Sequence, residues 1–135
     1  MKILLDTHVF LWFITGDARL SEAMRHGIRE PENEAYLSVV SVWETMVKHQ
    51  LGKLPLPAPP ESYIPAQRER HRIESLAVDE ASVACLARLP PLHRDPFDRM
   101  LICQAIRHDL VLATADAAMR GYTIDVPGTP WQRPR

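Results

Sequence analysis

Short apolar runs that alternate with segments of helical periodicity are the feature that most limits how this chain can fold. Residues 3–5 and 110–114 have the continuous apolar character of strands buried on both faces of a sheet, and residues 35–38 predict a further strand. Strands that alternate with helices predict an α/β protein with a central, mostly parallel sheet. In such folds ligands bind beyond the carboxyl ends of the strands.

The pattern predicts most of the other elements. We expect helices over residues 7–14, 22–29, 39–51, 61–70, 79–87 and 96–108, a weak strand within 72–78, a short helix near 117–120 and a strand near 122–126. Ser21 and Asp79 are predicted N-caps, and Gly52 is placed to end its helix. The chain of 135 residues is predicted to be one domain, with an irregular Pro-rich tail from about residue 127.

The helix predicted to begin at residue 39 has one apolar stripe. Ser41, Glu44, Thr45, Lys48 and His49 lie away from this stripe. Its members are Val39, Val42, Trp43, Met46, Val47 and Leu51.

Charge and cysteine content narrow the class of protein. The formal net charge is −1, whereas a protein that binds nucleic acid by charge alone is usually more basic, so such a partner would need a local basic patch or bound cations. Cys85 and Cys103 lie in apolar helical patterns, which predicts buried thiols in a reducing compartment. The first residues lack a signal-peptide layout and no apolar run approaches ~18 residues, so we expect a cytoplasmic protein without a membrane partner.

Five carboxylates map to the carboxyl edge of the predicted sheet. Asp6 follows the first strand, Asp116 follows the strand over 110–114, and Glu44 lies early in the helix after the second strand. Asp95 and Asp98 begin the helix over 96–108, which is entered from a loop. Because carboxyl ends of parallel strands share one edge, these acids from four separate segments are expected to converge.

Each acid also has a simpler interpretation. Asp6 and Asp116 would serve as N-caps of the helices that follow them. Glu44 stands four residues before Lys48, the favoured order for an exposed ion pair on a helix.

The same holds for the two acids at the start of the helix over 96–108. Asp95 followed by Pro96 is typical of an N-cap with proline in the first helical position. Asp98 would then occupy the third position, as in a capping box.

Hard oxygen ligands without cysteine or histidine among them suit Mg²⁺ or Mn²⁺. Such ions activate water and stabilise the charge that develops on a phosphodiester. Arg94, Arg99 and the cluster at Arg68, Arg70 and Arg72 would contact phosphates or lie on a solvated surface. His8 and His93, close to the acids in sequence, would support the site or face the substrate.

Four segments, taken in order, resemble the PIN domain, and their spacing most resembles the VapC toxins of bacterial toxin–antitoxin pairs. They are Leu4-Leu5-Asp6-Thr7-His8, Ser38-Val39-Val40-Ser41-Val42-Trp43-Glu44, His93-Arg94-Asp95-Pro96-Phe97-Asp98-Arg99-Met100-Leu101-Ile102 and Leu112-Ala113-Thr114-Ala115-Asp116. The resemblance implies a three-layer α/β/α sandwich around the parallel sheet. It also implies an Mg²⁺- or Mn²⁺-dependent endoribonuclease that cleaves RNA, forms a homodimer and is silenced by a cognate VapB-type antitoxin.

The resemblance also assigns roles to residues. Asp6, Glu44, Asp98 and Asp116 match the four acids of the family, and Asp95 is an additional acid of the Asp-Pro-Phe-Asp subgroup. We predict that Asp6, Asp98 and Asp116 bind the metal, directly or through water, while Glu44 and Asp95 complete the pocket and orient the attacking water. The predicted supporting residues are Thr114, Ser41 and Arg99.

Two alternatives belong to other functional classes. An acidic-pocket phosphatase would use Asp6 as its nucleophile, but position 8 holds His8 where haloacid-dehalogenase-like phosphatases have a second aspartate. A non-catalytic partner-binding module would use the acids only as helix caps.

Overall fold

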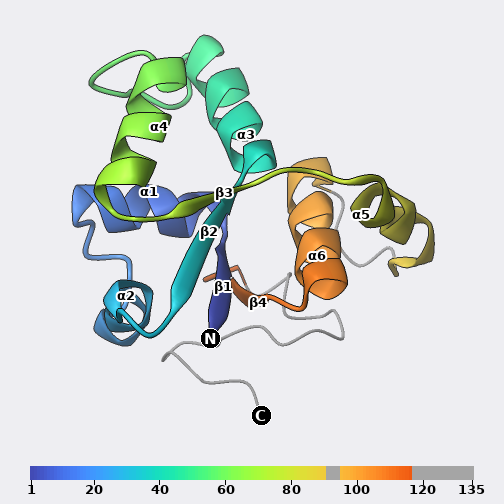
Figure 1. The fold of residues 1–135 in the computed structure, drawn as a ribbon. Helices are drawn as coiled ribbons and strands as arrows, with labels where there is room; N and C mark the ends of the chain where they lie inside the picture. Colours follow the sequence, from blue (N-terminus) through green and yellow to red (C-terminus); the bar gives the residue numbers. More distant parts are fainter. Residues whose placement is uncertain (91–94, 117–135) are drawn as a thin grey trace.

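A computed structural model describes residues 1–90 and 95–116 of the chain (Figure 1). Its strands are β1 (Lys2–Leu5), β2 (Glu34–Ser38), β3 (Glu74–Leu76) and β4 (Val111–Ala113). Its helices are α1 (Thr7–Thr15), α2 (Glu22–Arg29), α3 (Val39–Gln50), α4 (Pro60–Arg70), α5 (Glu80–Cys85) and α6 (Pro96–His108), with a 3₁₀ turn at Leu86–Arg88. The helix near 117–120, the strand near 122–126, the tail and His93 and Arg94 lie outside the described residues.

The strands form one sheet in the order β3-β2-β1-β4, and every described pairing is parallel. Leu4 of β1 pairs with Tyr36 of β2 on one side and with Leu112 of β4 on the other. The mostly parallel sheet expected from the sequence is therefore confirmed. Because β1 is central, its carboxyl end lies at the middle of the edge where ligands bind in such folds.

The two faces of the sheet are covered by different helices, which gives the three layers. Ile3, Leu5 and Leu37 pack on one face against α1, α2 and α4. Leu4 and Leu112 point to the other face and pack against α5 and α6. Successive side chains of a strand alternate between faces, so β1 and β4 are apolar throughout because both of their faces are buried. The predicted three-layer sandwich is confirmed.

Side-chain caps fix where several helices begin. Ser21 accepts a hydrogen bond from the backbone N–H of Met24, and Asp79 accepts one from that of Ser82, as predicted. Gly16 ends α1 with a φ of 67°, a conformation in which a side chain is strained.

The apolar stripe of α3 is not the face that this helix buries. Ser41, Glu44 and Thr45, which the pattern set apart from the stripe, are buried, whereas Val39, Trp43 and Leu51 of the stripe are exposed. The polar side of α3 is turned inward because Ser41 and Glu44 hydrogen-bond with Thr7 of α1, and hydrogen bonding removes most of the penalty for burying them. Within the described part of the chain, no helix is long and apolar enough to span a membrane.

Candidate active site

The carboxyl edge of the sheet brings segments from four parts of the sequence together. Asp6 directly follows β1, α3 begins directly after β2, and Thr114 directly follows β4. In Figure 1, β1 rises from the N-terminus beside β2, and β2 leads upward into α3. The predicted acids lie on these segments.

Asp6 is held at the centre of this edge by Thr114. The Thr114 hydroxyl donates a 2.7 Å hydrogen bond to Oδ2 of Asp6, and both side chains are buried. The same hydroxyl oxygen accepts a 3.0 Å hydrogen bond from the backbone N–H of Asp116. The ends of β1 and β4 are thereby tied together through one hydroxyl group. Asp6 occupies the N-cap position of α1, as the capping interpretation predicts, but its side chain makes no cap hydrogen bond and is bonded to Thr114 instead.

The surroundings of Asp6 disfavour its negative charge. Burial raises the pKa of Asp6 above its ordinary value, and the nearby charge of Glu44 raises it further. The Thr114 hydroxyl and the charge of His8 act in the opposite direction but do not cancel the effect. A buried carboxylate beside a second carboxylate is an environment that a bound cation would stabilise.

Glu44 is the second acid, and it is almost fully buried. The Thr7 hydroxyl lies 2.8 Å from Oε1 of Glu44 and 2.8 Å from Oγ of Ser41. Because a hydroxyl has one proton, Thr7 donates to the carboxylate and accepts from Ser41. The Lys48 ammonium donates a 2.6 Å hydrogen bond to Oε2. The ion pair with Lys48 therefore forms, but it is not the exposed surface pair of the alternative interpretation, since Glu44 is only 2% exposed.

The pKa of Lys48 is also affected by the charges of the acids of α6. Burial lowers the pKa of Lys48, but the hydrogen bond to Glu44 and the charges of Glu44, Asp95 and Asp98 together raise it above its ordinary value. Asp95 and Asp98 lie at the start of α6, which packs against α3 through the contact between Phe97 and Trp43. The Asp95 side chain accepts a 3.0 Å hydrogen bond from the backbone N–H of Asp98, so the predicted cap of α6 is confirmed.

Two side chains of the site were not identified from the sequence as members of it. Thr7 follows Asp6 directly, and Lys48 lies one helical turn after Glu44. Their positions relative to the two acids could therefore have identified them as neighbours of the site. Arg99, a predicted supporting residue, is partly buried and donates a 3.3 Å hydrogen bond to the carbonyl of Pro90.

The chemistry of the donors suits a hard divalent cation, since they are carboxylate and hydroxyl oxygens. Residues 1–90 and 95–116 hold no group of three or more acidic, histidine or cysteine side chains gathered closely enough to bind a metal ion. The assignment of Asp6, Asp98 and Asp116 as ligands thus stays a prediction.

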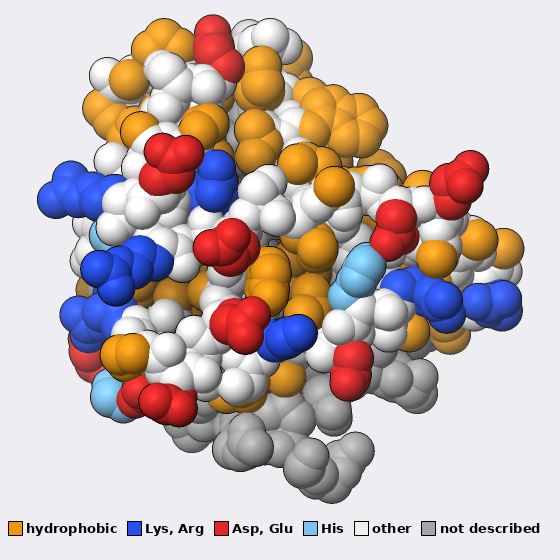
Figure 2. Space-filling view, in the orientation of Figure 1, with side chains coloured by type: hydrophobic (Ala, Val, Ile, Leu, Met, Phe, Trp, Pro, Cys, Tyr) orange, Lys and Arg blue, Asp and Glu red, His pale blue; other side chains and the backbone are white. Residues whose placement is uncertain are grey.

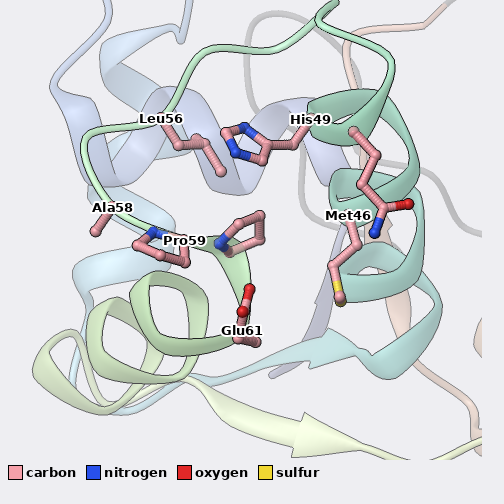
Figure 3. A pocket seen from close by; sticks show the side chains of 8 residues that line it. Met46, His49, Leu56, Ala58, Pro59 and Glu61 are labelled. Carbon is pink, nitrogen blue, oxygen red and sulfur yellow. The ribbon is translucent and has the colours of Figure 1, made fainter.

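A separate pocket of about 420 Å³ lies between the C-terminal half of α3 and the start of α4 (Figure 3). Met46 and His49 reach it from α3, and Leu56, Pro59 and Glu61 line it from the connection to α4 and from α4 itself. Its lining is largely apolar and contains none of the five predicted acids. The pocket is therefore distinct from the acidic edge, meaning the carboxyl edge of the sheet with Asp6, Glu44 and the acids at the start of α6.

Comparison with known proteins places this geometry in a family. Residues 3–123 match the profile of the PIN domain. The chain is similar to Ribonuclease VapC22 of Mycobacterium tuberculosis, with 28% identity over 130 residues that cover 96% of this chain and 98% of that protein. Ribonuclease VapC16 of the same organism is 39% identical over 57 residues, which are 42% of this chain and 40% of that protein.

Solved structures agree on the fold. VapBC2 from Rickettsia felis, bound to a DNA fragment from its promoter, superposes with a TM-score of 0.71 at 13% identity, covering 98% of this chain and 100% of that chain. VapBC-1 from nontypeable Haemophilus influenzae gives a TM-score of 0.65 at 17% identity, covering 95% and 96% of the two chains.

Proposed function

Because the chain belongs to the PIN domain family, we propose that it is a metal-dependent endoribonuclease and the toxin of a toxin–antitoxin pair. The observation that carries this proposal is the acidic edge, where Asp6 and Glu44 are buried and held by hydrogen bonds from Thr114, Thr7 and Lys48. The similarity to a VapC ribonuclease over nearly the whole chain supports the same activity.

Asp6, Asp98 and Asp116 are the residues that would hold Mg²⁺ or Mn²⁺. A bound divalent ion would lower the pKa of a water molecule and stabilise negative charge on the phosphate. Its positive charge would also offset the burial and repulsion that raise the pKa of Asp6. This explains how a chain with a net charge of −1 would bind a polyanion.

The remaining residues of the site position these groups. Thr114 fixes the orientation of Asp6 through its 2.7 Å hydrogen bond. Glu44, held by Thr7 and Ser41, would orient the attacking water together with Asp95. Lys48 would hold the Glu44 carboxylate in place through its 2.6 Å hydrogen bond, and its positive charge would offset part of the negative charge of the acids.

The biological setting is part of the proposal. Similarity to VapBC complexes supports a VapB-type antitoxin as the protein partner, and the family resemblance supports a homodimer that acts in the cytoplasm on RNA. An antitoxin that silences the enzyme would have to cover or distort the acidic edge.

The test is cleavage of a labelled RNA in the presence of Mn²⁺ by the wild-type chain and two variants. Asp6→Asn keeps the size of the side chain and an oxygen for Thr114, so it should fold normally and lose cleavage. Asp109→Asn is the matched control, because Asp109 is exposed at the opposite end of α6 from Asp95, and this variant should retain full activity. Wild-type cleavage rates in Asp6→Asn would refute the assignment of the active site.

A further inference from the structure

Trp43 is a large aromatic side chain that the fold leaves at the surface. It is 61% exposed, and it is the aromatic member of the exposed large hydrophobic residues in the described part of the chain. Figure 2 shows hydrophobic side chains gathered in the upper part of the molecule, over α3 and toward α6. An exposed tryptophan loses the benefit of burying its apolar rings, so a ligand that covers it would bind favourably.

The orientation of Trp43 is fixed by Phe97. The two ring centroids are 4.9 Å apart and the rings meet edge to face at 86°. Phe97 is itself partly buried against the core between the sheet and α6. A single edge-to-face neighbour covers at most one face of the indole, so Trp43 is held in place while much of its surface stays open.

This aromatic pair lies beside the acidic edge. Trp43 directly precedes Glu44 on α3, and Phe97 directly precedes Asp98 in the first turn of α6. Their contact therefore joins α3, which carries Glu44, to the first turn of α6, which carries Asp98 and is capped by Asp95. A polymer bound with one phosphate at the acids would have its neighbouring units within reach of the indole.

We propose that Trp43 is a stacking platform for an unpaired base of a single-stranded RNA whose backbone lies at the acidic edge. This inference rests on the proposed function and names its substrate class, because a base paired within a helix has no free face to stack on an indole. Proteins bind single strands by stacking bases on aromatic side chains beside a positively charged groove, and here the divalent ion of the proposed function would supply the positive charge.

In the described part of the chain, few large apolar residues of α3 are exposed around Trp43, which favours a base over a protein partner. Val39, one turn earlier on α3, is the nearest exposed apolar residue along the helix, and Leu51 lies two turns later. A stable protein interface buries about 800 Å² on each side, whereas one indole matches the area of one base.

The experiment measures the RNA affinity of the chain with Asp6 intact, in Ca²⁺, a hard cation that carboxylates bind, and a gel checks that the RNA stays uncut. The probe is a fluorescein-labelled, unstructured RNA of about 12 nucleotides, followed by anisotropy, with a duplex of the same length for comparison. Trp43→Leu should weaken binding of the single strand by about 5-fold to 100-fold, and Trp43→Phe should stay within about 3-fold of the parent. Leu51→Ala is the control, since it removes an exposed apolar side chain just beyond the C-terminal end of α3, two turns after Trp43, and it should not change the affinity.

The outcomes separate this inference from the proposed function. Unchanged affinity in Trp43→Leu overturns the inference, and if sedimentation then shows a changed oligomeric state, the face is a protein interface. Duplex binding that equals single-strand binding also overturns it. If the wild-type chain neither binds nor cleaves RNA with Mn²⁺ present, both the proposed function and the inference fail. If the wild-type chain cleaves single strands and Trp43→Leu binds them with unchanged affinity, only the inference is rejected.

Discussion

Replacing Thr114 by valine tests whether the site depends on one hydroxyl group. Valine keeps the branched shape of threonine, so the packing of this fully buried side chain is preserved. The substitution removes the donor to Oδ2 of Asp6 and the acceptor for the backbone N–H of Asp116. The result is a buried carboxylate that has lost one donor and a backbone group that has lost one acceptor.

The expected loss of stability follows from these two bonds. A hydrogen bond to a charged group contributes about 1.5–3 kcal/mol, and one between neutral groups about 1 kcal/mol. Thr114→Val should therefore lower the free energy of unfolding by about 2–4 kcal/mol. For a domain of this size 1 kcal/mol corresponds to roughly 3–5 °C, so the melting temperature should fall by about 6–20 °C.

The assay is thermal unfolding in EDTA, together with the pH dependence of RNA cleavage in Mn²⁺. Since the Thr114 hydroxyl lowers the pKa of Asp6, its removal should move the acidic limb of the cleavage profile to higher pH. Thr45→Val is the matched control: Thr45 is equally buried, but its hydroxyl donates to the neutral carbonyl of Ser41. That variant should lose at most about 1 kcal/mol and leave the pH profile in place.

Equal destabilisation in the two valine variants would refute the reasoning, because it would show that the charge of Asp6 adds nothing to the bond. An unshifted acidic limb in Thr114→Val would refute the link between this hydroxyl and the ionisation of Asp6.

Three further predictions concern single side chains. Asp95→Asn should keep the cap of α6 and the melting temperature but bind Mn²⁺ more weakly, as measured by calorimetry. Asp95→Ala should bind Mn²⁺ more weakly and also lose about 1 kcal/mol of stability, because it removes the cap. Equal Mn²⁺ affinity in the wild type and both variants would show that Asp95 serves only as a helix cap. The pKa of Asp6 is raised in the folded state, so the wild type loses stability as pH rises through that pKa. Asp6→Asn carries no such charge and should therefore have a higher melting temperature than the wild type in EDTA near neutral pH. This difference in melting temperature should shrink toward pH 4. Burial and the neighbouring Cys85 raise the pKa of Cys103 to about 12, so iodoacetamide at pH 8 should leave native Cys103 unlabelled by mass spectrometry and react with it after denaturation.

Much of the fold follows from local patterns. The continuous apolar runs around β1 and β4 predict strands buried on both faces, and Asp95 followed by Pro96 predicts the start of α6 at the right residue. These features depend on the chemistry of neighbouring residues, which the sequence contains in full.

The orientation of α3 could not be predicted in the same way. Its apolar stripe indicated one face, but Thr7 of α1 supplies a partner that allows Ser41 and Glu44 to be buried instead. A hydrogen bond between residues 37 positions apart is invisible to periodicity, and it decides which side of the helix faces inward.

The candidate site was predicted as a set of acids, without the groups that hold them. That strand ends share one edge places Asp6 and Glu44 in the same region of the sheet, whereas a metal-binding cluster that also includes Asp98 and Asp116 stays a prediction. The role of Lys48 depends on how α3 and α6 pack, because its ammonium lies near Asp95 and Asp98 only in the folded chain.

The most direct test of the central claim is the rate of RNA cleavage after removal of divalent metal ions. The purified chain is treated with EDTA, freed of the chelator and assayed on a labelled single-stranded RNA while Mn²⁺ or Mg²⁺ is added back. If the acidic edge binds the catalytic metal, the chain should not cleave RNA without metal and should regain cleavage with either ion. Full cleavage in excess EDTA would contradict it.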